Sequence, residues 1–229
     1  EDISDDQNAV TLFVEVETKL QLTPEQEQLI DDIAMNTKDV DAHSAELATI
    51  VSANQEVRTL MHDARSRPKV EWGTRFRTPA IMNLVLPPLG RYRIVSKFLA
   101  SSAAYDAHRG EHGLALCALE DLVFQGDAVN SHPTLIMNLV GMAIVSMATN
   151  RIESLAPSLM VENQGGQCTH CVTRNQVEAL IRRLIDPETP RAALLGAMRG
   201  ERMLVYDIHR STLEGSISPR SITFGGITG

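Results

Sequence analysis

The sequence predicts an all-α protein built from antiparallel helical hairpins, and three observations lead to this prediction. Apolar residues recur with the 3.6-residue period of amphipathic helices, most clearly between Ile94 and Arg151. Aromatic residues make up only 4% of the chain, which is typical of helix bundles rather than of β-sandwiches. Short breaks containing Gly or Pro separate the periodic segments, so consecutive helices are expected to pack antiparallel.

Residues 1–66 form an N-terminal helical segment in this interpretation. The first helix is expected over Ala9–Leu20, where apolar residues lie on one side. Thr23 begins a capping box: its side chain can cap the next helix, Pro24 suits the first helical position, and Gln26 can reach back to the cap. That helix is expected to end near Asn36. Two shorter helices follow in the rest of the segment.

A connection rich in proline occupies residues 67–93 and carries the only tryptophan, Trp72. We expect an ordered connection that is held in place by Trp72. It precedes a helical-hairpin bundle over residues 94–210, in which Pro187 and Pro190 are expected to interrupt the last helices. Residues 211–229 are interpreted as a flexible tail. The alternative, that all four segments form one domain, is left open.

The bundle is clearest at its first hairpin. Ile94 opens one apolar stripe, and the break at Gly110 can adopt the left-handed conformation that often ends a helix. Ala103, Gly110 and Ala115 stand where a tetratricopeptide-type repeat has its small residue, turn glycine and second-helix alanine, so this hairpin resembles such a repeat. A third helix carries several apolar residues from Leu135 onwards. No clean second copy follows at a 34-residue period, so the sequence favours a short array rather than a regular solenoid.

The formal net charge of −8 is concentrated at one end: residues 1–50 contain 13 acidic and 2 basic side chains. We interpret these acids as solvated helix faces. The chain has no basic run and no aromatic stacking platform, so nucleic acid is not expected as a partner. It starts at Glu1 rather than at methionine, which fits an exported domain whose leader or membrane anchor preceded this point.

Several stretches together resemble a family of uncharacterised bacterial proteins typical of planctomycetes. They are Asn8-Ala9-Val10, Arg67-Pro68 with Trp72-Gly73, the segment 94–151, and 194–202 (Leu-Leu-Gly-Ala-Met-Arg-Gly-Glu-Arg). The resemblance implies an all-helical extracytoplasmic domain, usually tethered to a membrane through an N-terminal segment. It implies no catalytic residue, because the family has no assigned activity.

Cys168-Thr169-His170-Cys171 is the sharpest local motif. Two cysteines at this spacing can close a disulfide ring, and a thiolate just before a helix would be stabilised by the helix dipole. A structural disulfide or unreactive loop thiols are favoured. A redox site and half of a zinc site remain alternatives, although zinc needs more ligands than this motif supplies.

His108-Arg109-Gly110-Glu111-His112 matches the H-x-x-E-H pattern of inverted zinc peptidases. That chemistry requires both histidines on one face of a continuous helix, with Glu111 activating the zinc-bound water. Gly110 instead indicates a turn between helices, so His108 and His112 are kept as an alternative metal site only.

Two further features of the same bundle are interpreted as structural. The adjacent carboxylates Glu120 and Asp121 point about 100° apart on a helix and are expected on a solvated face. Cys117 is expected to be a small core residue.

The sequence thus favours a non-catalytic scaffold or protein-interaction domain that binds a protein or peptide in an apolar groove. It indicates no cofactor. The alternatives are a metal-dependent hydrolase that uses His108, Glu111 and His112, and a thiol-redox protein that uses Cys168 and Cys171.

Overall fold

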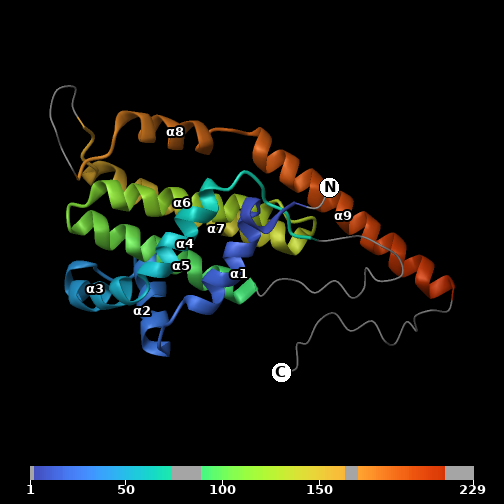
Figure 1. The fold of residues 1–229 in the computed structure, drawn as a ribbon, viewed down its shortest axis with the longest axis horizontal. Helices are drawn as coiled ribbons and strands as arrows, with labels where there is room; N and C mark the ends of the chain where they lie inside the picture. The colour runs from blue at the N-terminus through green and yellow to red at the C-terminus, as the bar shows by residue number, and fades with distance from the viewer. Residues whose placement is uncertain (1–2, 74–88, 163–169, 215–229) are drawn as a thin grey trace.

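The computed structural model describes residues 3–73, 89–162 and 170–214, and helices are the regular secondary structure of this part of the chain (Figure 1). The predicted all-α class is confirmed. Extended pairing within the described residues is limited to two isolated bridges, between Asn8 and Lys69 and between Val161 and Val172.

The N-terminal helices form where capping and apolar spacing predict them. Thr23 caps α2: its hydroxyl oxygen accepts from Gln26 N at 3.3 Å, and Gln26 Oε1 accepts from Thr23 N at 3.0 Å. Both halves of the predicted capping box are therefore present. The helices of this segment are α1 (Ala9–Lys19), α2 (Pro24–Ala34), α3 (Ser44–Ala53) and α4 (Gln55–Ser66).

Three long helices form the centre of the molecule: α5 (Leu89–His108), α6 (His112–Asn130) and α7 (Leu135–Leu155). The break between α5 and α6 contains Gly110 at φ +78°, a left-handed conformation that a glycine adopts without steric cost. The short connections make these helices antiparallel neighbours, and α6 packs against both α5 and α7.

A glycine sets the distance between α6 and α7. A Cβ added to Gly141 would lie 2.4 Å from the backbone nitrogen of Asn130, so α7 approaches the end of α6 more closely than any side chain permits. Gly141 lies on the side of α7 that faces inwards. The buried residues of α7 are Met137, Asn138, Gly141, Ile144, Ala148 and Arg151.

The connection that carries Trp72 is held as the sequence predicts. The indole Nε1 donates to the carbonyl oxygen of Ala128 at 2.9 Å, and the ring stands edge-on to Tyr92 with centroids 5.8 Å apart. Phe13 lies on another side of the indole, at a centroid distance of 6.1 Å. Apolar side chains from both sides of residues 67–93 meet in one buried cluster around this point.

Two helices complete the described chain: α8 (Arg174–Leu184) and α9 (Glu188–Leu213). The expected interruption at Pro190 is wrong, because α9 begins at Glu188 and runs through it. Proline is tolerated there since the first-turn N–H groups of a helix have no partner within the helix. In Figure 1, α9 runs along the outside of the bundle, and its C-terminal end projects beyond the other helices.

One segment, Leu135–Ser158, is long and apolar enough to cross a membrane by length and composition alone. A core helix of a soluble protein can pass the same test, and α7 packs along both α6 and α5. The guanidinium of Arg151 is buried in this segment and donates to the carbonyl oxygen of Ile33.

Candidate functional site

The structure separates the members of the H-x-x-E-H motif. His108 is the last residue of α5 and its Nδ1 lies 2.8 Å from Asp41 Oδ1, whereas His112 is buried at the start of α6. Glu111 lies in the turn and its Oε2 is 2.6 Å from His170 Nδ1. The motif therefore spans a helix–helix turn, as Gly110 indicates, and the two histidines are not on one helix.

The cysteine motif falls partly outside the described residues. Cys168 and Thr169 are not described, whereas Cys171 is half-buried just before α8. Thr173 caps that helix through a second capping box with Gln176. The Cys168–Cys171 disulfide stays a prediction.

The first candidate feature of the described surface is the orientation of α9. Its buried residues are small or polar: Ala197, Gly200, Asp207 and Ser211. At 100° per residue, six exposed apolar side chains of α9 gather on the opposite side of the helix, and we call this set the outer face of α9. It consists of Leu194, Leu195, Met198, Val205, Tyr206 and Leu213.

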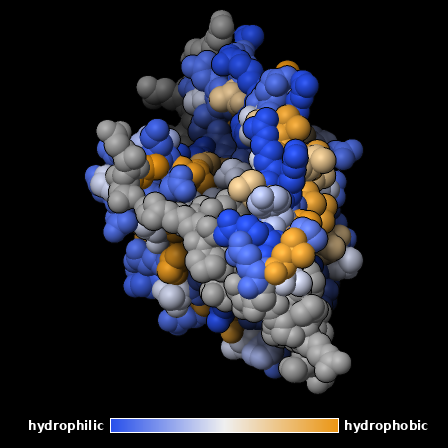
Figure 2. Space-filling model, turned by 90° about the vertical axis from the view of Figure 1, so that its right-hand side faces the viewer, coloured by the Kyte–Doolittle hydropathy of each residue, from blue (hydrophilic) through white to orange (hydrophobic). Residues whose placement is uncertain are grey.

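α7 also exposes apolar side chains beside α9. Gly141 and Asn138 face inwards together with Met137 and Ile144, whereas Leu139 is 62% exposed. Glu201 of α9 binds the start of α7, where its Oε1 accepts from Leu135 N at 3.0 Å. The view in Figure 2, from the side on which α9 projects, shows apolar side chains in a band among polar ones. The exposed apolar residues of α7 are Leu135, Ile136, Leu139 and Met142.

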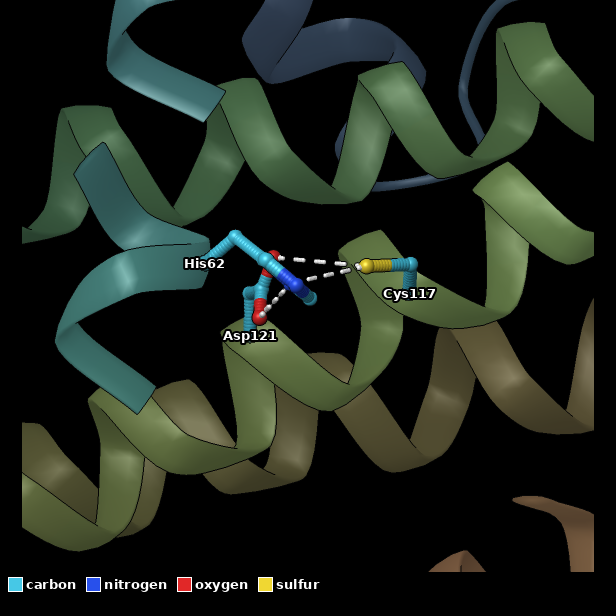
Figure 3. A group of neighbouring side chains, drawn as sticks. All are labelled: His62, Cys117 and Asp121. Atoms are coloured by element: carbon cyan, nitrogen blue, oxygen red, sulfur yellow. Dashed lines mark hydrogen bonds and ion pairs between the residues drawn. The ribbon is translucent and has the colours of Figure 1, made fainter. Parts of the chain in front are cut away.

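The second feature is a polar cluster between α4 and α6 (Figure 3). Cys117 and Asp121 stand four residues apart and share one face of α6, and His62 reaches them from α4. Cys117 Sγ lies 3.2 Å from His62 Nδ1 and 3.9 Å from Asp121 Oδ2, and His62 Nδ1 lies 3.7 Å from Asp121 Oδ1. A cavity of about 270 Å³ opens at this cluster, between α4 and α6.

Arg65 balances the charge of the cluster. Its Nε lies 2.7 Å from Asp121 Oδ1, and its Nη1 pairs with Glu120. Asp121 is only 3% exposed, so the expectation that Glu120 and Asp121 form a solvated face is wrong. Cys117 is half-buried and lines this polar cluster, so the expectation of a core cysteine is wrong as well. Both side chains are held inwards because α4 packs over this face of α6.

Burial raises the pKa of Asp121 to about 6, although the neighbouring Arg65 opposes the shift. Burial also raises the pKa of Cys117 to about 11, and the charge of Asp121 adds to this. Cys117 is therefore a thiol at neutral pH. In addition, the same nitrogen of His62 faces both the thiol and the carboxylate, whereas a nucleophilic triad uses the two imidazole nitrogens separately. The cluster does not have the arrangement of an activated cysteine nucleophile.

The chain matches no protein-family model, no curated protein and no solved structure. Function must therefore be argued from the two features themselves.

Sequence reasoning missed both features for different reasons. The four-residue spacing of Cys117 and Asp121 is visible in the sequence, but His62 lies on another helix. For α7 and α9 the apolar spacing predicts a helix, and it does not say which side a neighbouring helix will cover.

Proposed function

We propose that this chain is a non-catalytic protein-interaction domain, and that the outer face of α9 together with the exposed side of α7 binds a helix of a partner protein. The observation that carries the proposal is the inverted orientation of α9, whose small and polar residues are buried while its apolar side chains are exposed. Water-exposed apolar side chains gain free energy when a partner covers them, and contiguous exposed patches mark interaction sites.

The charges around this face favour an acidic partner helix. Arg202 lies among the apolar side chains of α9 and Arg199 lies beside them, whereas Arg191, on the same side, pairs with Glu188 at 3.8 Å. Within the described residues, neither Arg199 nor Arg202 has a carboxylate within ion-pair distance. A second copy of the chain would place these arginines against each other, which disfavours self-pairing through this face. The net charge of −8 disfavours an anionic membrane surface.

We also propose that the α5–α6 hairpin is of the tetratricopeptide type and that the domain lies outside the cytoplasm. The α5–α6 hairpin with its turn glycine supports the first, and the sequence resemblance described above supports the second. Helix pairs of this kind bind partner helices in apolar grooves.

A labelled model helix with leucines on one side and glutamates flanking them serves as the probe, and fluorescence anisotropy measures its binding. Wild type is expected to bind it more tightly than an otherwise identical helix flanked by lysines. Met198→Glu places a charge in the centre of the face and is expected to weaken binding at least about tenfold. Val14→Glu is the matched control, because Val14 is an equally exposed apolar side chain on α1.

Three results would contradict the proposal. Equal binding by the Met198→Glu and Val14→Glu variants would show that the probe does not use this face. A dimer by light scattering that Met198→Glu dissociates would identify a second copy as the occupant. Binding to vesicles of phosphatidylcholine and phosphatidylglycerol that Met198→Glu abolishes would identify a lipid surface instead.

A further inference from the structure

We propose that His62, Cys117 and Asp121 form a binding site for a zinc ion between α4 and α6, with the fourth coordination position open to the adjacent cavity. This inference is independent of the interaction surface on α9, since it concerns different helices.

The spacing of the three side chains fits a tetrahedral ion. With usual bond lengths to sulfur, nitrogen and oxygen, the donor atoms of a tetrahedral zinc site lie about 3.3–3.6 Å apart. Here Cys117 Sγ and His62 Nδ1 lie 3.2 Å apart, while Asp121 faces the nitrogen with Oδ1 at 3.7 Å and the sulfur with Oδ2 at 3.9 Å. Binding through one carboxylate oxygen therefore requires a small rotation of the Asp121 carboxylate. Each of the three side chains offers a ligand atom within 4.8 Å of the other two.

Asp121 supplies a second, independent indication of a ligand. It is 3% exposed, and its Oδ1 makes no hydrogen bond although Arg65 Nε lies 2.7 Å away. The Arg65 contact is thus an ion pair without the alignment of a hydrogen bond. The Arg65 ion pair compensates the charge of this buried oxygen but leaves its hydrogen-bonding capacity unfilled, and coordination to a cation would fill it.

The donor types favour zinc over magnesium or calcium. Thiolate, imidazole and carboxylate are the usual zinc ligands, whereas magnesium and calcium prefer oxygen donors throughout. Three protein ligands leave one position for water or a small ligand. His62 and Cys117 both line the 270 Å³ cavity, so this position is reached from solvent.

Arg65 is the competitor of the ion. Its Nη2 lies 3.2 Å from His62 Nδ1 and 3.6 Å from Cys117 Sγ, so the guanidinium lies close to where the ion would bind. Its Nη1 already pairs with Glu120, which gives the arginine an anchor when the ion enters. Binding also requires the Cys117 thiol to lose its proton, which the metal promotes because zinc binds the thiolate.

Cobalt(II) titration of the purified chain in the presence of a thiol-free reductant tests the site. A tetrahedral site with a thiolate ligand is expected to produce visible d–d bands and a near-ultraviolet sulfur-to-cobalt charge-transfer band, and one equivalent of zinc is expected to bleach both. The charge-transfer band should disappear in Cys117→Ser and persist when Cys168 and Cys171 are both replaced by serine.

Zinc affinity, measured by competition with a chromophoric chelator, separates the ligands from their surroundings. Loss of an outer-shell partner alone typically weakens a metal site 10–100-fold, so His62→Ala is expected to cost about 100-fold. His62 is largely exposed, so this variant should fold normally. His108→Ala is the matched control, since His108 also pairs with a carboxylate but has no thiol beside it. Arg65→Met should raise the affinity about tenfold because it removes the competing cation.

A charge-transfer band that survives Cys117→Ser would overturn the site, as would its absence in wild type. An equal loss of affinity in His62→Ala and His108→Ala would show non-specific histidine binding and overturn it as well. A fall in zinc affinity in Arg65→Met would also overturn the site, because removal of a cation next to the bound ion cannot weaken binding there.

Discussion

The close approach of α7 to α6 at Gly141 provides the sharpest test of the fold. Replacing Gly141 by alanine adds a methyl group 2.4 Å from Asn130 N and 2.6 Å from Asn130 Cα. Both of these atoms are backbone, so no rotamer change can relieve the overlap. The ends of α6 and α7 must move apart by roughly 1 Å to restore an ordinary contact, and a gap of that size forfeits a quarter to a half of each dispersion contact nearby.

The expected cost is worked from two opposing effects. Alanine gains about 1 kcal/mol over glycine in a helix interior. Overpacking against a rigid neighbour costs about 1–3 kcal/mol and occasionally more, and here the contact is with backbone on a central helix pair. At the upper end of this cost, we expect Gly141→Ala to lower the free energy of unfolding by about 2 kcal/mol net.

Urea unfolding followed by circular dichroism measures this change, and α9 provides the control. A Cβ at Gly196 would meet nothing within 4 Å, so Gly196→Ala should raise the free energy of unfolding by about 0.5–1 kcal/mol. The reasoning would be refuted if Gly141→Ala lowered stability by less than 1 kcal/mol, or if both variants changed it in the same direction.

Three further variants test interactions within the bundle. Arg58→Met leaves the buried carboxylate of Asp106 without its ion-pair partner, so unfolding by urea should show a loss of about 3 kcal/mol; the same stability as wild type would contradict a role for the pair. Burial lowers the pKa of His132 to about 4, so the folded state holds this imidazole neutral while the unfolded chain protonates it near pH 6.5. Because of this residue, the free energy of unfolding of wild type should fall by about 3 kcal/mol more than that of His132→Gln from pH 6.5 to pH 4. A difference between the two unfolding free energies that does not change with pH would contradict the argument. Thr23→Ala removes the cap of α2 and should lower the free energy of unfolding in urea by about 1 kcal/mol. Thr49→Ala, at an exposed position of α3, should change this free energy little. Equal effects of the two variants would show that the capping box contributes nothing.

Much of the fold follows from local patterns in the chain. Thr23 with Gln26 predicts the start of α2, and Gly110 predicts the turn between α5 and α6, because capping bonds and left-handed backbone depend on residues only a few positions apart. Trp72 was expected to hold the proline-rich connection, and its indole does bind Ala128. The same patterns were misleading for Pro190, because a proline is tolerated in the first turn of a helix and α9 contains it there.

The candidate sites depend on contacts between residues distant in sequence. The spacing of Cys117 and Asp121 places them on one side of α6, but whether that side meets solvent or another helix depends on α4. The prediction of a solvated Asp121 failed for this reason. The H-x-x-E-H motif shows the converse, since its residues are adjacent in the chain and yet His108 and Glu111 have separate partners.

By itself, the sequence determined that this chain is all-helical, where most of its helices begin, and where α5 turns into α6, since these properties depend on hydrogen bonds and backbone conformations within a few residues. Only the tertiary structure decided which side of each helix is covered. Gly141 lets α7 approach α6 closely on its inward side, which also carries Met137 and Ile144, whereas Leu139 on the other side faces solvent. The packing of α4 on α6 likewise brings His62 to Cys117 and Asp121. Periodicity cannot specify either outcome, because it describes one helix at a time, whereas burial depends on the shape of the neighbouring helix.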